Sequence, residues 1–220
     1  MKKVLRSCFI LLGVACMSAS GFLYWQGQTQ EDTAQVVSLS VAQTFQETMK
    51  QEPVEGTQET QTSVTAATSV AQTMETSVSG AVEVATVEID GQGYIGLMSI
   101  PQLGLELPVA STYTDAKVKQ TPCVYVGSFE EGYLVIGAHN YAAHFGNLDQ
   151  LLLGDEISIL DTYGYVHTYV LGKQESIAGT DVEALCLGDW DLTLFTCVYG
   201  NNTQREVLRF YALGVESVDA

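Results

Sequence analysis

From Tyr94 onward, hydrophobic and polar positions alternate in short runs, which is the pattern of β-strands. Glycine, proline, asparagine and aspartate separate the runs, as expected for turns. The pattern predicts eight strands, at 94–100, 105–111, 123–127, 133–139, 156–162, 165–172, 191–197 and 205–214. Eight short strands with little helix between them are typical of a sandwich or a closed barrel. We therefore expect an all-β domain over residues 87–220.

Three short helices are predicted between the strands, at 114–120, 146–153 and 180–185. In the last of them Thr180 is followed three positions later by Glu183, which is the spacing of a capping box. Helix should therefore be a minor part of this domain.

A continuous apolar stretch lies near the N-terminus, from Cys8 to Trp25, and contains no charged residue. It is close to the minimum of about 17 residues that span a bilayer. Basic residues precede it, which predicts a cytoplasmic N-terminus and an exterior location for everything after Trp25. We expect residues 1–25 to form a transmembrane signal anchor. A cleaved signal peptide is the alternative, because the small residues at 18–20 offer a cleavage site.

Residues 26–86 are rich in Thr, Gln, Ser, Val, Glu and Ala, with Phe45 as the only aromatic residue and Lys50 as the only basic one. Such a composition buries too little apolar surface to offset the entropy lost on ordering. The segment is therefore predicted to be a disordered, acidic linker of low complexity between the membrane and the domain. Helical association through its Val, Ala and Met positions is the alternative.

The chain is strongly acidic, with a formal net charge of -17. The predicted domain shares this character, because 18 of the 26 acidic residues follow residue 87 and only five basic residues do. This balance excludes nucleic acid as a partner. It suits an exposed soluble domain, and it would also attract basic or amine-bearing substrates.

Three chemically useful side chains lie at the predicted strand ends. Cys197 closes the run 192–197, His139 follows the apolar run 133–138, and Arg205 comes eight positions after the cysteine. A thiol at a strand end is both held in place and reachable. A cysteine, a histidine and an arginine together suggest a nucleophile, an acid/base and a partner for an oxyanion.

These residues resemble those of the sortase family, the cysteine transpeptidases of the Gram-positive cell surface. Residues 193–197 match the family's TLxTC signature, and Arg205 falls where the family keeps its arginine. Residues 135–140 look like the histidine strand, and 94–109 are similar to the first two strands. In one departure, Ala138 rather than glycine directly precedes the histidine, which removes no reacting group.

The resemblance implies an eight-stranded sortase-type β-barrel with a few short helices. The segment 172–191 would be the variable loop beside the substrate groove. It is too short for the long helix of some sortase classes, and no Asp-Pro-aromatic lid precedes the histidine. These features favour a class B- or D-like member over a pilin-polymerising one.

The resemblance also implies the chemistry. The thiolate of Cys197 would attack the Thr-Gly bond of an LPxTG-like sorting signal, His139 would act as acid and then base, and Arg205 would stabilise the oxyanion. Thr196 and Asn140 are further candidates, for contact with the bound peptide. Both also suit plain structural roles, Thr196 as a strand former and Asn140 as a turn or loop-orienting residue.

Several other residues have weaker functional readings. Arg209 is the alternative to Arg205. Cys123 and Cys186 are expected to be buried small side chains, and His144 to be a loop histidine or a neighbour of the site. His167 is expected at the surface. The scheme needs no metal or redox cofactor, although acidic loop residues could bind activating calcium: Glu130, Glu131, Glu175, Asp181 and Glu183.

The expected partners are the sorting-signal peptide of a surface protein and an amine acceptor, either a cell-wall precursor or a pilin. Three alternatives stay open at this point. They are a pilin-polymerising sortase, a hydrolytic cysteine protease, and a surface β-barrel that binds without catalysis.

Overall fold

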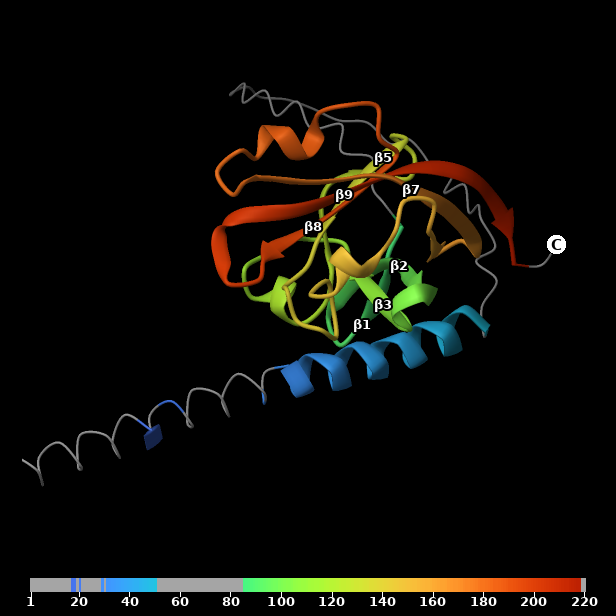
Figure 1. Cartoon of the computed structure of the whole chain (residues 1–220). Coiled ribbons are helices and arrows are strands. Elements are labelled where there is room, and N and C mark those ends of the chain that lie inside the picture. The colour runs from blue at the N-terminus through green and yellow to red at the C-terminus, as the bar shows by residue number, and fades with distance from the viewer. Residues whose placement is uncertain (1–16, 19, 21–28, 30, 51–84, 219–220) are drawn as a thin grey trace, which may run out of the picture.

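The structure is a computed structural model that describes residues 17, 18, 20, 29, 31–50 and 85–218. Its strands are β1 (Val87–Ile89), β2 (Gln92–Ile100), β3 (Leu105–Ala110), β4 (Cys123–Ser128), β5 (Tyr133–Gly137), β6 (Glu156–Asp161), β7 (Tyr165–Ala178), β8 (Leu192–Val198) and β9 (Asn201–Ser217). Four short 3-10 helices join them: η1 (Pro101–Leu103), η2 (Lys117–Lys119), η3 (Leu148–Gln150) and η4 (Glu183–Cys186). Figure 1 shows the arrangement.

The strands close into a barrel. They follow the order β1-β2-β3-β4-β5-β8-β9-β7-β6, and β6 pairs with β2 to complete the ring. Strand β1 lies outside the ring, because it pairs only with β2 as a short hairpin. The ring therefore contains the eight strands β2 to β9, which confirms the predicted eight-stranded barrel.

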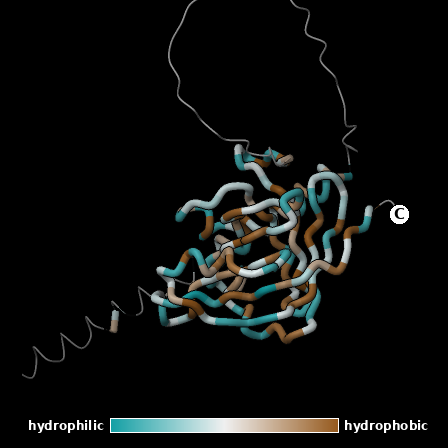
Figure 2. The backbone as a smooth tube through the Cα atoms, turned by 90° about the horizontal axis from the view of Figure 1, so that it is seen from above, coloured by the Kyte–Doolittle hydropathy of each residue, from teal (hydrophilic) through white to brown (hydrophobic). Residues whose placement is uncertain are grey.

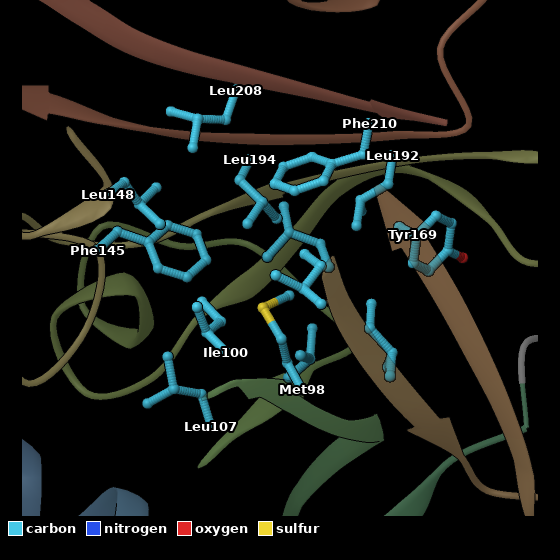
Figure 3. Packing of buried hydrophobic residues seen from close by; sticks show 14 of the residues in the cluster. Met98, Ile100, Leu107, Phe145, Leu148, Tyr169, Leu192, Leu194, Leu208 and Phe210 are labelled. Carbon is cyan, nitrogen blue, oxygen red and sulfur yellow. The ribbon is translucent and has the colours of Figure 1, made fainter. Parts of the chain in front are cut away.

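The alternating sequence pattern builds the barrel interior. Side chains from alternate positions of each strand point inward, as for Leu192 and Leu194 of β8 and for Leu208 and Phe210 of β9. Figure 3 shows these four side chains meeting Met98 and others at the centre of the core. The hydropathy of the backbone trace alternates accordingly in Figure 2. Burial of this set supplies the main driving force for folding.

Two strands are longer than predicted. Strands β7 and β9 pair with each other from Tyr165↔Ser217 to Ala178↔Gln204, and two irregularities in register interrupt the ladder. The polar residues near their ends hid this extension from the hydrophobic pattern. The length of β9 matters for the site, because this strand pairs with β8 from the barrel core as far as the end of β8 that carries Cys197.

The capping box predicted at Thr180 and Glu183 does not form. The helix η4 starts at Glu183, and no side chain caps its first residue. Asp181 makes a similar contact, since its Oδ1 accepts a hydrogen bond from the Ala184 backbone N–H at 3.3 Å. The aspartate is closer to the short helix and a stronger acceptor than a hydroxyl.

The prediction of a disordered linker is wrong for residues 31–50, which form an α-helix. Its buried positions share one face of the helix: Ala34, Ser38, Val41, Ala42 and Phe45. This face packs on Leu97, Tyr94 and other residues of the barrel wall. Figure 1 shows the helix in blue along the side that carries β1, β2 and β3. The tertiary contact supplies what the composition of the segment lacks.

The remaining predictions for the N-terminal part fall outside the described residues. Nearly all of the predicted anchor at 1–25 lies there, and so does the linker from 51 to 84. Among the described residues, no helix has the length and apolar character that crossing a membrane requires.

Candidate active site

Cys197 and Arg205 face each other across neighbouring antiparallel strands. They are direct partners in the β8–β9 ladder, just before the register shifts at Val198. Both side chains are half-buried, so each is held by the sheet and still reachable. The β8–β9 hairpin therefore sets Cys197 and Arg205 at one register position of neighbouring strands.

His139 approaches the same strand from the other side. Strand β5 runs parallel to β8, and the last paired residues are Gly137 and Phe195. His139 and Cys197 each come two residues after this last pair, Cys197 still within β8 and His139 in the loop that follows β5. The strands that carry or precede the three candidate residues are neighbours in the order β5-β8-β9, with the cysteine strand in the middle.

Two contacts fix this register at the site. The Thr196 hydroxyl donates to the Ala138 carbonyl at 2.9 Å, and the Ala138 N–H donates to the Phe195 carbonyl at 3.2 Å. The ring of Phe195 also lies over Gly137, where an added Cβ would come within 2.5 Å of it. Glycine is required there by this close approach.

The position of Thr196 differs from the predicted substrate contact. Its side chain is only 2 % exposed, and its hydroxyl bonds to the protein's own backbone. It therefore ties the nucleophile strand to the chain just before His139. Asn140 is half-buried in the loop that follows, and its role as a substrate contact stays a prediction.

Two cavities lie at the cysteine–arginine pair. One of about 520 Å³ is lined by Cys197, Tyr199 and the carboxylates of Asp149, Glu175 and Glu206. Another of about 110 Å³ is lined by Arg205 and by an apolar wall that includes Leu185 of η4 and the rings of Tyr113, Tyr125 and Phe195.

The aromatic wall of the smaller cavity is a cluster that the sequence did not reveal. The rings of Tyr113 and Tyr125 meet edge to face at 5.3 Å, and that of Tyr125 meets Phe195 in the same way at 5.4 Å. The three residues come from distant parts of the chain, and only Phe195 belongs to a recognisable motif.

His139 has a neutral imidazole at ordinary pH. Burial lowers its pKa below the usual value, and the positive charge of Lys119 lowers it further. Its ring stacks on that of Tyr141 with 4.0 Å between the centroids. Its backbone N–H donates to the Val118 carbonyl at 3.0 Å, so the residue is held at both main chain and ring.

Arg209 is bound inside the protein. Its guanidinium donates to Glu175 Oε1 at 3.0 Å, to Thr193 Oγ1 at 3.1 Å, and to the carbonyls of Ala184 and Leu185. The side chain is only 2 % exposed. It fixes η4, and with it the Leu185 wall of the smaller cavity, and it leaves Arg205 as the arginine next to Cys197.

The other two cysteines of the domain differ from each other. Cys123 is fully buried as expected, and burial raises the pKa of its thiol to about 12. Cys186 is exposed, which contradicts the expected burial, because it ends η4 on the surface. Hydrophobicity alone does not distinguish a strand cysteine from one at the end of a short helix.

The comparison with known families agrees with this geometry. The family model described as a sortase domain matches residues 98–212, from β2 to β9 and just over half of the chain. This chain belongs to the sortase family. The family consists of cysteine transpeptidases, and the sortase domain therefore identifies an enzyme.

Individual sortases are similar over the same region. Sortase A of Bacillus anthracis is 27% identical over 146 residues, which cover 61% of this chain and 67% of that protein. The solved structure of sortase A from Listeria monocytogenes has a TM-score of 0.51 at 19% identity and covers 57% of this chain and 90% of its own. Sortase C1 from Streptococcus agalactiae has a TM-score of 0.50 at 22% identity, with coverages of 58% and 71%. These structures share the fold.

The sortase holds a second histidine in its interior, next to the first. His144 is fully buried, and of the two expectations from the sequence, a loop histidine or a neighbour of the site, the second fits its place next to His139. Burial and the neighbouring His139 lower its pKa to about 4, against a slight opposing effect of the Gln120 carbonyl. Nothing in the spacing of the two histidines reveals this burial.

We expect His144 to make the sortase sensitive to acid. Between the ordinary pKa of 6.5 and the folded value of about 4, the unfolded chain binds a proton that the folded chain does not. Stability is therefore intact above pH 6.5 and falls as the pH drops toward the folded pKa of about 4, by roughly 2 to 3 kcal/mol. Urea unfolding of the parent and of His144→Gln at two pH values measures this difference. Equal losses of stability in both proteins would contradict it.

Within the described residues, no group of three or more His, Cys, Asp or Glu side chains is arranged to hold a metal ion. Calcium activation stays a prediction from the sequence.

Proposed function

We propose that this sortase cleaves an LPxTG-like sorting signal between Thr and Gly and transfers the new carboxyl end to an amine of the cell wall. The observation that supports the proposal is the order of three neighbouring strands: Cys197 of β8 pairs with Arg205 of β9, and His139 follows the end of β5 on the other side of β8. The three side chains are the ones that a thioester mechanism requires.

In the first half of the reaction, the thiolate of Cys197 attacks the carbonyl carbon of the Thr-Gly bond. A carbon–sulfur bond forms, and the carbonyl electrons move onto oxygen. The guanidinium of Arg205, paired across the strands with Cys197, donates to this oxyanion. The carbon–nitrogen bond then breaks, and protonated His139 gives its proton to the departing glycine amine.

In the second half, an amine attacks the thioester. Neutral His139 takes a proton from this amine, and the carbon–sulfur bond breaks to regenerate the thiolate. Burial lowers the pKa of His139, which favours the neutral form that acts as the base here.

The two cavities support a two-substrate reaction. The apolar and aromatic wall beside Arg205 suits the uncharged side chains of a sorting motif. The larger cavity on the side of Cys197 leaves room for a second molecule to reach the thioester.

Incubation of the sortase with an LPxTG-type peptide, with and without a short oligoglycine, tests the proposal. Cleavage in both cases and a peptide–glycine product only with the added amine are expected. Hydrolysis alone, unchanged by the amine, would indicate a cysteine protease. No cleavage and no thiol-dependent labelling would indicate a binding module.

The proposed reaction takes place at the cell surface. We infer that residues 1–25 hold the enzyme in the membrane with the catalytic domain outside, which is supported by the basic flank and the apolar stretch. Fractionation of cells that express the full chain, followed by protease treatment from outside, tests this location.

A further inference from the structure

The helix at 31–50 is joined to the barrel by more than apolar packing. Its C-terminal half carries the apolar contacts, with Phe45 fully buried and Val41 almost so. Its N-terminal half adds polar contacts, through Glu31 and Ser38, to the loops at 117–122 and 139–146.

The polar contacts converge on one loop, residues 139–146, which we call the histidine loop. Glu31 Oε1 accepts a hydrogen bond from the Ala142 backbone N–H at 2.7 Å. Ser38 Oγ lies 3.3 Å from His144 Nε2, and it also donates to the Gln120 carbonyl at 3.3 Å. Two turns of the helix thus hold the loop at two points.

The donor in the contact between Ser38 and His144 depends on the tautomer of the ring. Burial lowers the pKa of His144, which favours a neutral ring at this contact.

The histidine loop is compact enough to transmit its position to His139. Tyr141 stacks on the His139 ring, and its carbonyl accepts from the N–H groups of His144 and Gly146 at 2.9 and 2.8 Å. The His139 carbonyl accepts from the Phe145 N–H at 3.3 Å. Phe145 itself is fully buried in the barrel core, as Figure 3 shows.

Space within the loop is equally limited. A Cβ at Gly146 would come within 2.6 Å of the Asn140 carbonyl oxygen. A shift of Ala142 or His144 therefore cannot be absorbed inside the loop and must move Tyr141 and the ring stacked on it.

We propose that the helix at 31–50 is part of the catalytic unit, and that Ser38, Glu31 and His144 are positioning residues that set the ring of His139. This inference rests on the proposed function of His139. A general acid or base must lie within hydrogen-bond reach of the proton that it moves, so a small displacement of the ring lowers turnover without weakening the binding of the peptide. The family match covers residues 98–212, so Glu31 and Ser38 lie outside it and His144 lies within it.

The test uses the full chain in detergent, with Ser38→Ala and Glu31→Ala combined. The chain contains only three histidines, so ¹⁵N-histidine NMR resolves each ring. We expect the resonances of His144 and His139 to shift or broaden. His167 is an internal control, because it pairs with Asp161 at 2.8 Å and stacks on Phe129, away from the helix contacts.

Turnover of an LPxTG-type peptide is the second readout. In the double variant kcat should fall about tenfold, with KM changed by less than about twofold. Ser40→Ala is the matched control, because this serine is exposed on the same helix and bonds only to the Val37 carbonyl. It should keep the parent kcat and the parent spectrum.

Three results would overturn the proposal. They are unchanged His139 resonances with unchanged kcat, a rise in KM in place of the fall in kcat, and a loss of all three histidine signals together with the melting transition. If the parent chain cleaves no peptide, the proposed function fails on its own. The NMR readout then still decides whether the helix sets the ring of His139.

Discussion

Replacement of Cys197 by alanine is expected to abolish both cleavage and transfer, with a fall in turnover of at least about 1,000-fold. In the proposed mechanism both half-reactions pass through a thioester on this sulfur, so no residual route through the enzyme would remain. The side chain is small and half-buried, and its loss should leave the melting temperature nearly unchanged. Peptide turnover and circular dichroism measure the two effects.

Cys123 and Cys186, the other two cysteines of the domain, are the controls. Cys186→Ala should keep full activity, because its side chain is exposed at the end of η4. Cys123→Ala should lose some stability but not activity, since this thiol is packed under the helix at 31–50 and stays protonated. If all three variants lost activity equally, the thiols would be structural and Cys197 would not be the nucleophile.

The barrel could be predicted because its strands carry a local signal. Alternation with period two directly encodes which side chains face the core, and turns with glycine or proline mark where strands end. The prediction was less complete for β7 and β9, whose outer parts extend beyond the packed core. Their length comes from pairing with each other, which no local pattern records.

The helix at 31–50 was only the alternative to a disordered linker, for a related reason. Its buried face contains small and polar residues, Ala34, Ser38 and Ala42, so the apolar stripe is weak. Its stability comes from a partner surface on β1 to β4 that is distant in the chain. The composition of the segment predicts its behaviour in isolation and carries no information about its packing on the barrel. A catalytic unit that starts at residue 87 would lack this helix.

The site residues divide in the same way. Cys197, His139 and Arg205 could be selected from the sequence because each lies at or near a strand end and matches a family motif. Thr196 was selected because it adjoins Cys197, yet its hydroxyl donates to the Ala138 carbonyl. His144 and the aromatic wall of Tyr113 and Tyr125 depend on tertiary proximity, and their sequence surroundings carry no signal.

The substitution Arg205→Lys is expected to lower turnover by about 100-fold or more while the fold stays intact. The substitution keeps the positive charge and removes the planar fork that can donate to an oxyanion and a neighbouring carbonyl together. Arg205 is half-buried and lines the smaller cavity, so its replacement changes the cavity wall and not the barrel core. The loss should therefore appear in kcat rather than in KM or in the melting temperature.

The substitution Arg209→Lys should give the opposite pattern, a loss of stability with kcat unchanged. Each of the two variants is therefore a control for the other. An ammonium group cannot reach Glu175, Thr193 and the two η4 carbonyls at once. Buried acceptors would lose their donors, at a cost of about 2 to 4 kcal/mol in the free energy of unfolding. Below its melting temperature Arg209→Lys should keep kcat, with a higher KM because η4 and Leu185 line the substrate cavity. A normal kcat in Arg205→Lys, or a large loss of kcat in a stably folded Arg209→Lys, would transfer the oxyanion role from Arg205 to Arg209.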